Sequence, residues 1–130
     1  MAEEVGDSDL LARLFIVQAS LAVDLGDVAV AESLFRQALQ LMHRIRNIAG
    51  VADCLDGLAR ASGARRRWKR AAALQGAAAA LRKSSQTVLP DLMQREVDRL
   101  SATLRAALGE SAYAQTRDVA ASIELHEIVS

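Results

Sequence analysis

Few side chains in this sequence combine a reactive type with a spacing that supports catalysis. Cys54 is the one cysteine, and a thiol acts as a nucleophile when a base such as histidine lies beside it. His43 and His126 are distant from Cys54 and from each other in the sequence, and they lack the spacing of a metal-binding pair. We therefore expect Cys54 to be a buried structural thiol, and we expect no metal and no cofactor.

The carboxylates also lack a catalytic pattern, because nothing pairs them as acid and base beside a substrate pocket. They fall at positions expected on helix surfaces: Asp53, Asp56, Glu96 and Asp98. The glycines and Lys83-Ser84 do not form the G-x-x-x-x-G-K-[ST] spacing of a phosphate-binding loop. The sequence therefore predicts that the protein is not an enzyme.

A basic segment is the strongest electrostatic feature. It consists of Arg65, Arg66, Arg67, Lys69 and Arg70, with Trp68 among them. Such a cluster can bind phosphate groups, and an indole can stack on a base. The rest of the chain has no basic stripe, so we favour a solvated helix start over nucleic-acid contact. Since arginines oppose the dipole of a helix start, a second interpretation is contact with acidic residues of a partner domain.

Length and composition indicate one helical domain. The chain has 130 residues, 52% of them apolar, with 7 glycines, 1 proline and no net charge. Alternating β-branched runs are absent, which favours an all-α fold. The acidic N-terminus lacks the basic start of a signal peptide, and no stretch approaches the ~18 apolar residues of a membrane span. We expect a cytoplasmic protein with no membrane contact.

Residues 26–45 have the clearest helical pattern. Apolar side chains recur at i, i+3, i+4 and i+7 on a face formed by Ala31, Leu34, Phe35, Ala38, Leu41, Met42 and Ile45. Gly26 is expected to end the preceding helix, and Asp27 to cap this one. Alanines one turn before and after Phe35 let a neighbouring helix approach closely. This pattern is typical of the second helix of a packed hairpin.

Other segments predict helices on both sides of this one. Residues 1–7 are expected to fray, with Asp7 or Ser8 capping a helix from about Asp9 to Leu25. Its predicted apolar side comprises Leu10, Leu11, Leu14, Phe15, Val17, Leu21, Ala22 and Leu25. After the central helix, Asn47 is expected to cap a third helix that Gly63 breaks. The basic segment is then expected to open a fourth helix, with an inward stripe of Ala71, Leu74, Ala78 and Leu81.

The last third of the chain predicts a different arrangement. Pro90 suits the first turn of a fifth helix, which ends at Gly109. Its stripe consists of Met93, Val97, Leu100, Leu104 and Ala107. We expect this stripe to be core packed on residues 71–81, rather than a coiled-coil seam with another chain. Short helices are expected near residues 111–118 and 122–129.

An internal repeat relates the two predicted hairpins. Ala19, Ala31, Leu34, Ala38 and Leu41 match Ala59, Ala71, Leu74, Ala78 and Leu81, each at an offset of 40 (59 − 19, 71 − 31, 74 − 34, 78 − 38, 81 − 41). Gly26 corresponds to Arg66 and Phe35 to Gln75, so the second repeat is expected to be degenerate. The matches predict two stacked hairpins, residues 8–46 and 47–84, followed by capping helices over residues 89–129.

These positions resemble the tetratricopeptide repeat family. The resemblance is carried by Gly26-Asp27, Ala31, Phe35 and Ala38 in the first hairpin, and by Leu58-Ala59, Ala71 and Ala78 in the second. Residues 45–59, 71–82, 108–113 and 122–129 are also similar to the C-terminal repeat regions of bacterial signalling ATPases and LuxR-type, MalT-like regulators. The resemblance implies a right-handed solenoid over residues 1–130 and a role in transcriptional or signalling regulation.

The same resemblance implies that the first helix of each hairpin lines a concave groove. Its predicted residues are Arg13, Ile16, Ser20, Val23, Asp53, Asp56 and Arg60. This mixed polar surface suits a protein or peptide segment, including another domain of the same regulator, and the alternative is a small-molecule sensor. A third interpretation is that the groove is incidental to a solenoid. An apolar solenoid end would also favour a homodimer.

Overall fold

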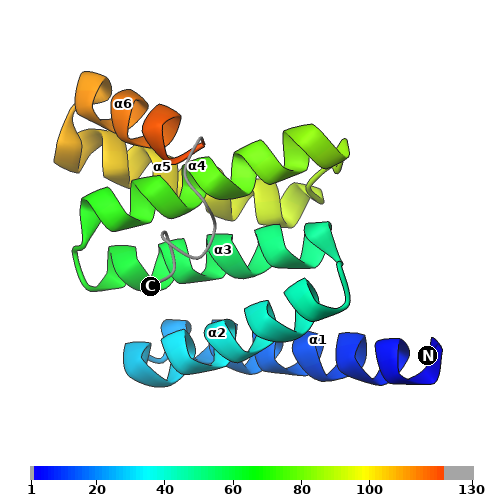
Figure 1. The fold of residues 1–130 in the computed structure, drawn as a ribbon. Coiled ribbons are helices and arrows are strands. Elements are labelled where there is room, and N and C mark those ends of the chain that lie inside the picture. Colours follow the sequence, from blue (N-terminus) through cyan, green and yellow to red (C-terminus); the bar gives the residue numbers. More distant parts are fainter. Residues whose placement is uncertain (1, 122–130) are drawn as a thin grey trace.

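The structure, a computed structural model, describes residues 2–121, and these residues form six helices and no strand (Figure 1). The helices are α1 (Ala2–Asp24), α2 (Val28–Arg44), α3 (Ile48–Ala64), α4 (Trp68–Ser85), α5 (Asp91–Leu108) and α6 (Glu110–Ala120). The predicted all-α class is confirmed. The helix expected over residues 122–129 lies outside the described part of the chain.

Successive helices pack largely as antiparallel pairs. The most extensive contacts join α1 to α2 and α3 to α4, and α2 then packs on α3 (Figure 1). The main core runs through these four helices, and a smaller cluster joins Ala71 and Ala72 of α4 to Leu104 and Tyr113. Against α4, α6 packs more extensively than α5 does. Both last helices therefore close the stack over α4.

Four turns of one kind set the spacing of the stack. Gly26, Arg46, Arg66 and Gln86 lie at intervals of twenty residues, with φ of +83°, +60°, +59° and +56°. In each turn the N–H of the next residue donates to a carbonyl five residues earlier, at 2.8–2.9 Å. This is the Schellman arrangement, in which one left-handed residue satisfies the last carbonyls of a helix. Two such turns make one hairpin, which agrees with the offset of 40 found in the sequence.

Ala31 and Ala71 occupy equivalent places. Both are fully buried at a helix start, where the N–H of Ala31 donates to the Asp27 carbonyl at 3.1 Å and the N–H of Ala71 donates to the Arg67 carbonyl at 3.0 Å. The predicted inward residues Leu74 and Ala78 are also fully buried. The central pattern and its repeat are therefore confirmed.

Two predictions about helix ends are wrong. Gly63 lies inside α3, which continues to Ala64 because the reversal is made by Arg66. Residues 65–67 form that turn, so α4 begins at Trp68 rather than at the start of the basic segment. The Gly26–Arg66 mismatch does not mark a degenerate turn, since Arg66 adopts the same left-handed conformation as Gly26. Hydrogen bonding of the turn holds Arg66 there against the steric preference of its Cβ.

The predicted side-chain cap is confirmed at the start of α3 and is wrong at the start of α2. The Asn47 side chain accepts a hydrogen bond from the N–H of Gly50 at 2.9 Å, as predicted. Asp27 occupies the corresponding position before α2, but its carboxylate makes no capping hydrogen bond. Pro90 lies directly before α5 rather than within its first turn. The predicted helix near residues 111–118 is α6, which begins at Glu110, directly after Gly109.

The first helix differs most from its prediction. It begins at Ala2, so residues 2–7 are helical and Asp7 and Ser8 lie inside α1 rather than capping it. Small residues make its contact with the core, with Ala12 and Ala19 fully buried and Ala22 nearly so. Most of the predicted apolar side is instead exposed: Leu10, Leu11, Leu14, Val17, Leu21 and Leu25. Alanines let α2 approach closely, while Phe15 of the predicted side packs against the core and the exposed leucines and Val17 do not.

Candidate binding groove

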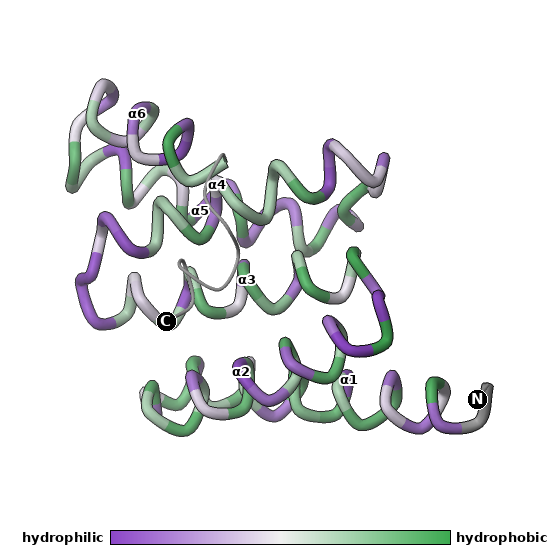
Figure 2. Tube along the Cα trace, viewed as in Figure 1, coloured by the Kyte–Doolittle hydropathy of each residue, from purple (hydrophilic) through white to green (hydrophobic). Residues whose placement is uncertain are grey.

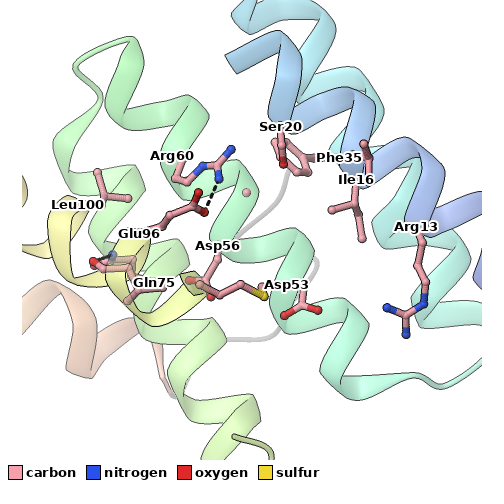
Figure 3. A pocket seen from close by; sticks show the side chains of 14 residues that line it. Arg13, Ile16, Ser20, Phe35, Asp53, Asp56, Arg60, Gln75, Glu96 and Leu100 are labelled. Atoms are coloured by element: carbon pink, nitrogen blue, oxygen red, sulfur yellow. Dashed lines mark hydrogen bonds and ion pairs between the residues drawn. The ribbon is translucent and has the colours of Figure 1, made fainter. Parts of the chain in front are cut away.

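An open cavity of about 420 Å³ lies between α1, α3 and α5 (Figure 3). Six of the seven predicted groove residues line it: Arg13, Ile16, Ser20, Asp53, Asp56 and Arg60. The seventh, Val23, lines a neighbouring cavity of about 310 Å³, which Arg60 also borders. The two hairpins therefore bring residues forty positions apart to one surface.

The wall formed by α5 was missed by sequence reasoning. Met93, Glu96, Val97 and Leu100 line the same cavity. Their stripe was predicted as core, and Leu104 is indeed fully buried, but Met93, Val97 and Leu100 are half-buried and Ala107 is exposed. The apolar spacing was the available signal, yet it could not show that α5 leaves part of this stripe facing the groove.

The floor of the cavity depends on one close contact. Phe35 of α2 lines the cavity from below and is almost fully buried. Its ring lies directly against Gly57 of α3, so that a Cβ added at Gly57 would overlap the ring. Only glycine lets the aromatic ring approach the α3 backbone this closely. The Phe35–Gly57 contact therefore joins the two hairpins at the apolar part of the groove, where Ile16 lies on the same side as Phe35 (Figure 3).

The two aspartates that line the groove form ion pairs with a buried arginine. Arg82 of α4 donates to Asp53 Oδ1 at 3.0 Å and pairs with Asp56 Oδ2. Asp56 is buried, which corrects the prediction of an ordinary surface carboxylate. Burial raises the pKa of Asp56 to about 6, although the nearby Arg82 opposes this shift. Both aspartates are thus structural ion-pair partners as well as groove residues.

Gln75 replaces the expected aromatic at the second repeat. It lies at the position equivalent to Phe35 and is also buried. Its amide donates to the Val97 carbonyl at 3.2 Å, while its oxygen accepts from Tyr113 Oη at 3.0 Å and from Ser101 Oγ at 3.3 Å. This hub links α4 to both α5 and α6. The buried Gln75 amide therefore holds α5, which forms a wall of the groove, and α6 against α4.

An ion pair crosses from α3 to α5 at the groove wall. Arg60 Nη1 donates to Glu96 Oε2 at 2.7 Å (Figure 3). Arg60 Nη2 is buried and has no hydrogen-bond partner among the described residues. Behind this wall a second cavity of about 530 Å³ shares Asp56, Gln75 and Val97 with the first. The groove therefore continues between α4 and α5.

The basic segment lies away from the groove, at the turn between α3 and α4. Arg65 pairs with Glu32 of α2 at 3.0 Å, so one acidic partner belongs to the same chain. Arg66 and Arg67 form the turn, and Lys69 is exposed at the start of α4. Partial burial lowers the pKa of Arg70, and the nearby Arg36 acts in the same direction. Trp68 is half-buried, because its indole packs against the smaller core cluster, and it also lines the neighbouring cavity that Val23 borders.

Cys54 is fully buried in the main core. Burial, together with the neighbouring Asp53, raises the pKa of its thiol to about 12. Such a thiol stays protonated and is a poor nucleophile. Within residues 2–121, no group of three or more histidine, cysteine and carboxylate side chains could hold a metal ion. His126 lies outside the described residues.

Comparison with known proteins finds no matching family model, no matching curated protein and no matching solved structure. Among residues 2–121, none of the helices is both long enough and apolar enough to cross a bilayer.

Proposed function

We propose that this chain is a non-enzymatic interaction module that binds an extended segment of a protein partner in the groove between α1, α3 and α5. The observation that carries the proposal is the convergence of three helices from different parts of the chain on one open cavity. Its floor is apolar, with Phe35, Ile16 and Leu100, and its rim is charged, with Arg13 and Glu96. An apolar floor with a few polar groups is typical of binding sites.

Charges in the groove favour a particular kind of segment. Two arginines and three carboxylates line the cavity, so its lining is slightly acidic. The buried Arg60 Nη2 needs an acceptor, because a buried donor without a partner is costly. A segment that inserts an apolar side chain and offers a backbone carbonyl to Arg60 would satisfy both requirements. A basic residue beside that apolar side chain would complement Glu96.

For the architecture, we propose a right-handed tetratricopeptide-like solenoid of two hairpins with two capping helices. The equal spacing of the four left-handed turns supports it, as does the shared burial of Ala31 and Ala71. The resemblance then favours the C-terminal repeat domain of a cytoplasmic bacterial transcriptional or signalling regulator. In that setting the partner segment could come from another domain of the same regulator.

The proposal is tested with a substitution that fills the groove and leaves the ion pairs of Arg82 with Asp53 and Asp56 intact. Substituting Asp53 or Asp56 would unpair Arg82, so Ser20→Trp is the better variant, with Ser33→Trp on the exposed side of α2 as the matched control. Peptides selected from a displayed random library against the natural chain should bind Ser33→Trp normally and Ser20→Trp at least about tenfold more weakly, a loss of about 1.4 kcal/mol. Equal binding to both variants, or no enriched peptide, would contradict the proposal.

The second candidate is a small-molecule sensor, which the cavity volume of about 420 Å³ favours because ligand sites commonly span about 300–1,000 Å³. A thermal-shift screen of sugars and amino acids tests it, since a ligand that binds only the folded state raises stability by mass action. A compound that stabilises the natural chain and Ser33→Trp, but not Ser20→Trp, would favour sensing over segment binding.

A further inference from the structure

The outer face of α1 is apolar although no described helix covers it. Its large exposed side chains are Leu10, Leu14, Val17 and Leu21, which expose 61%, 53%, 58% and 57% of their surface. Leu11 and Leu25 extend the same surface at its edges. With Ala12 and Ala19 buried on the opposite side, α1 is apolar on two faces, and Figure 2 shows hydrophobic residues along much of its length. A helix that is apolar all round is normally covered on both sides.

The internal repeat relates the outer face of α1 to a face of α3 in the same molecule. At the offset of 40, Leu10, Leu14, Val17 and Leu21 correspond to Gly50, Cys54, Gly57 and Ala61 of α3. All four of these α3 residues are buried, and the face they form packs on α2. The exposed stripe of α1 is therefore equivalent to an established helix-docking face.

The residue types on the two faces differ, and the difference identifies the occupant. On α3, Gly50 receives Met42 and Gly57 receives the ring of Phe35. On α1, Leu10 and Val17 stand at these two positions, so a helix like α2 could not approach α1 as closely as α2 approaches α3. Large branched side chains instead pack well against similar side chains between neighbouring helices, as in a coiled coil. The α1 face is thus unsuited to another hairpin of this repeat and suited to its own copy.

We propose that the outer face of α1 binds the same face of a second copy of this chain in an antiparallel, two-fold symmetric dimer. The stripe has the spacing four, three, four, which reads identically in both directions. Antiparallel pairing therefore places Leu10 opposite Leu21 of the other copy and Leu14 opposite Val17, as an isologous interface requires.

The available area is sufficient for such a dimer. The six exposed leucine and valine side chains offer on the order of 500 Å² of apolar surface per copy, or about 1,000 Å² for the pair, which reaches the lower bound of specific interfaces. Arg13 and Gln18 flank the stripe and are exposed, so they add a polar rim. Val17 also lines the groove, so the second copy would lie along one edge of the groove mouth.

Analytical ultracentrifugation of the full chain tests the proposal across micromolar to submillimolar concentrations. The natural chain should sediment as a dimer of its 13.9 kDa monomer. The double variant Leu14→Glu, Leu21→Glu should be monomeric with unchanged helical circular dichroism, because both positions are exposed in the single chain. Leu92→Glu on α5, where leucine is 74% exposed, is the matched control and should remain dimeric.

Three results would overturn the proposal: a natural chain that is monomeric throughout, a dimer that survives the double variant, or a dimer that Leu92→Glu also abolishes. The antiparallel orientation has its own test. Antiparallel pairing places Asp24 opposite Asp7 of the other copy, so Asp24→Lys should tighten the dimer severalfold. Parallel pairing would replace aspartate opposite aspartate by lysine opposite lysine, which leaves the repulsion in place, so a dimer of unchanged or lower affinity would rule out the antiparallel arrangement.

Discussion

The contact between Phe35 and Gly57 leads to a prediction in which one substitution changes sign with its background. Glycine inside a helix costs about 1 kcal/mol relative to alanine, so Gly57→Ala should stabilise α3 if nothing else opposed it. Here the new Cβ would overlap the buried Phe35 ring, and such overpacking costs about 1–3 kcal/mol. The ring is only 1% exposed and belongs to the main core, so moving it away from the new Cβ would disturb its packing against its other neighbours. After the gain in helix propensity is subtracted, we expect Gly57→Ala to lower the free energy of unfolding by up to about 2 kcal/mol.

Removing the ring should reverse this effect. Phe35→Ala alone leaves a cavity and should cost about 3–5 kcal/mol. In that background the Cβ at position 57 meets empty space, so Gly57→Ala should now stabilise the protein by about 1 kcal/mol. The coupling free energy between the two substitutions is then the overpacking cost itself, about 1–3 kcal/mol, a value typical of residues in direct contact.

Urea unfolding followed by far-ultraviolet circular dichroism measures all four members of this cycle. Gly6→Ala in α1 is the control, because a Cβ at Gly6 meets no atom within 4 Å. It should stabilise both backgrounds equally, by about 1 kcal/mol. Phe35→Leu can replace Phe35→Ala if too little folded protein remains. If Gly57→Ala had the same effect with and without the ring, the described floor of the groove would be wrong.

Three further predictions concern buried groups and one turn. Asp56 has a pKa of about 6 in the folded state, against an ordinary value of 3.8, so the folded state binds the proton more tightly than the unfolded state does. The free energy of unfolding should therefore fall by up to about 3 kcal/mol as the pH rises from about 4 to above 6. Asp56→Asn should remove this pH dependence, as urea unfolding at a series of pH values would show. Cys54, fully buried with its thiol pKa raised to about 12, should react with a thiol reagent only as fast as the protein unfolds; rapid labelling in the native state would contradict its placement. Arg66, at φ +59°, strains the turn that Gly26 makes without strain, so Arg66→Gly should stabilise the protein by up to about 1 kcal/mol, as a higher urea midpoint would show.

The helical class and the repeat could be predicted from the sequence because both rest on local or periodic signals. The face of α2 that contains Ala31, Phe35 and Ala38 follows directly from the helical period, and all three residues are buried. Asn47 acts within its own first turn, so its cap was also predictable. Six groove residues followed from the resemblance to tetratricopeptide repeats, which implies that the first helix of each hairpin lines the groove.

Signals that depend on other helices were read incorrectly. The α1 helix has apolar residues on more than one face. Its helical period alone therefore could not show that the alanines face the core and the leucines face outward. Arg66 has no local signature of a left-handed turn, and the carbonyls at the end of α3 impose that conformation. Asp56 resembles a surface carboxylate until Arg82, on another helix, pairs with it.

The sequence by itself determined where helices form and which of their positions repeat, since these properties depend on neighbours within a turn or two. Only the tertiary structure decided which α1 face is buried, that α5 walls the groove, and that Gln75 joins α4 to α5 and α6. Each of these features depends on the distance and the angle between two helices, and the side chains of both helices together determine these quantities. A single helix encodes the shape of its own surface but not the surface that will meet it.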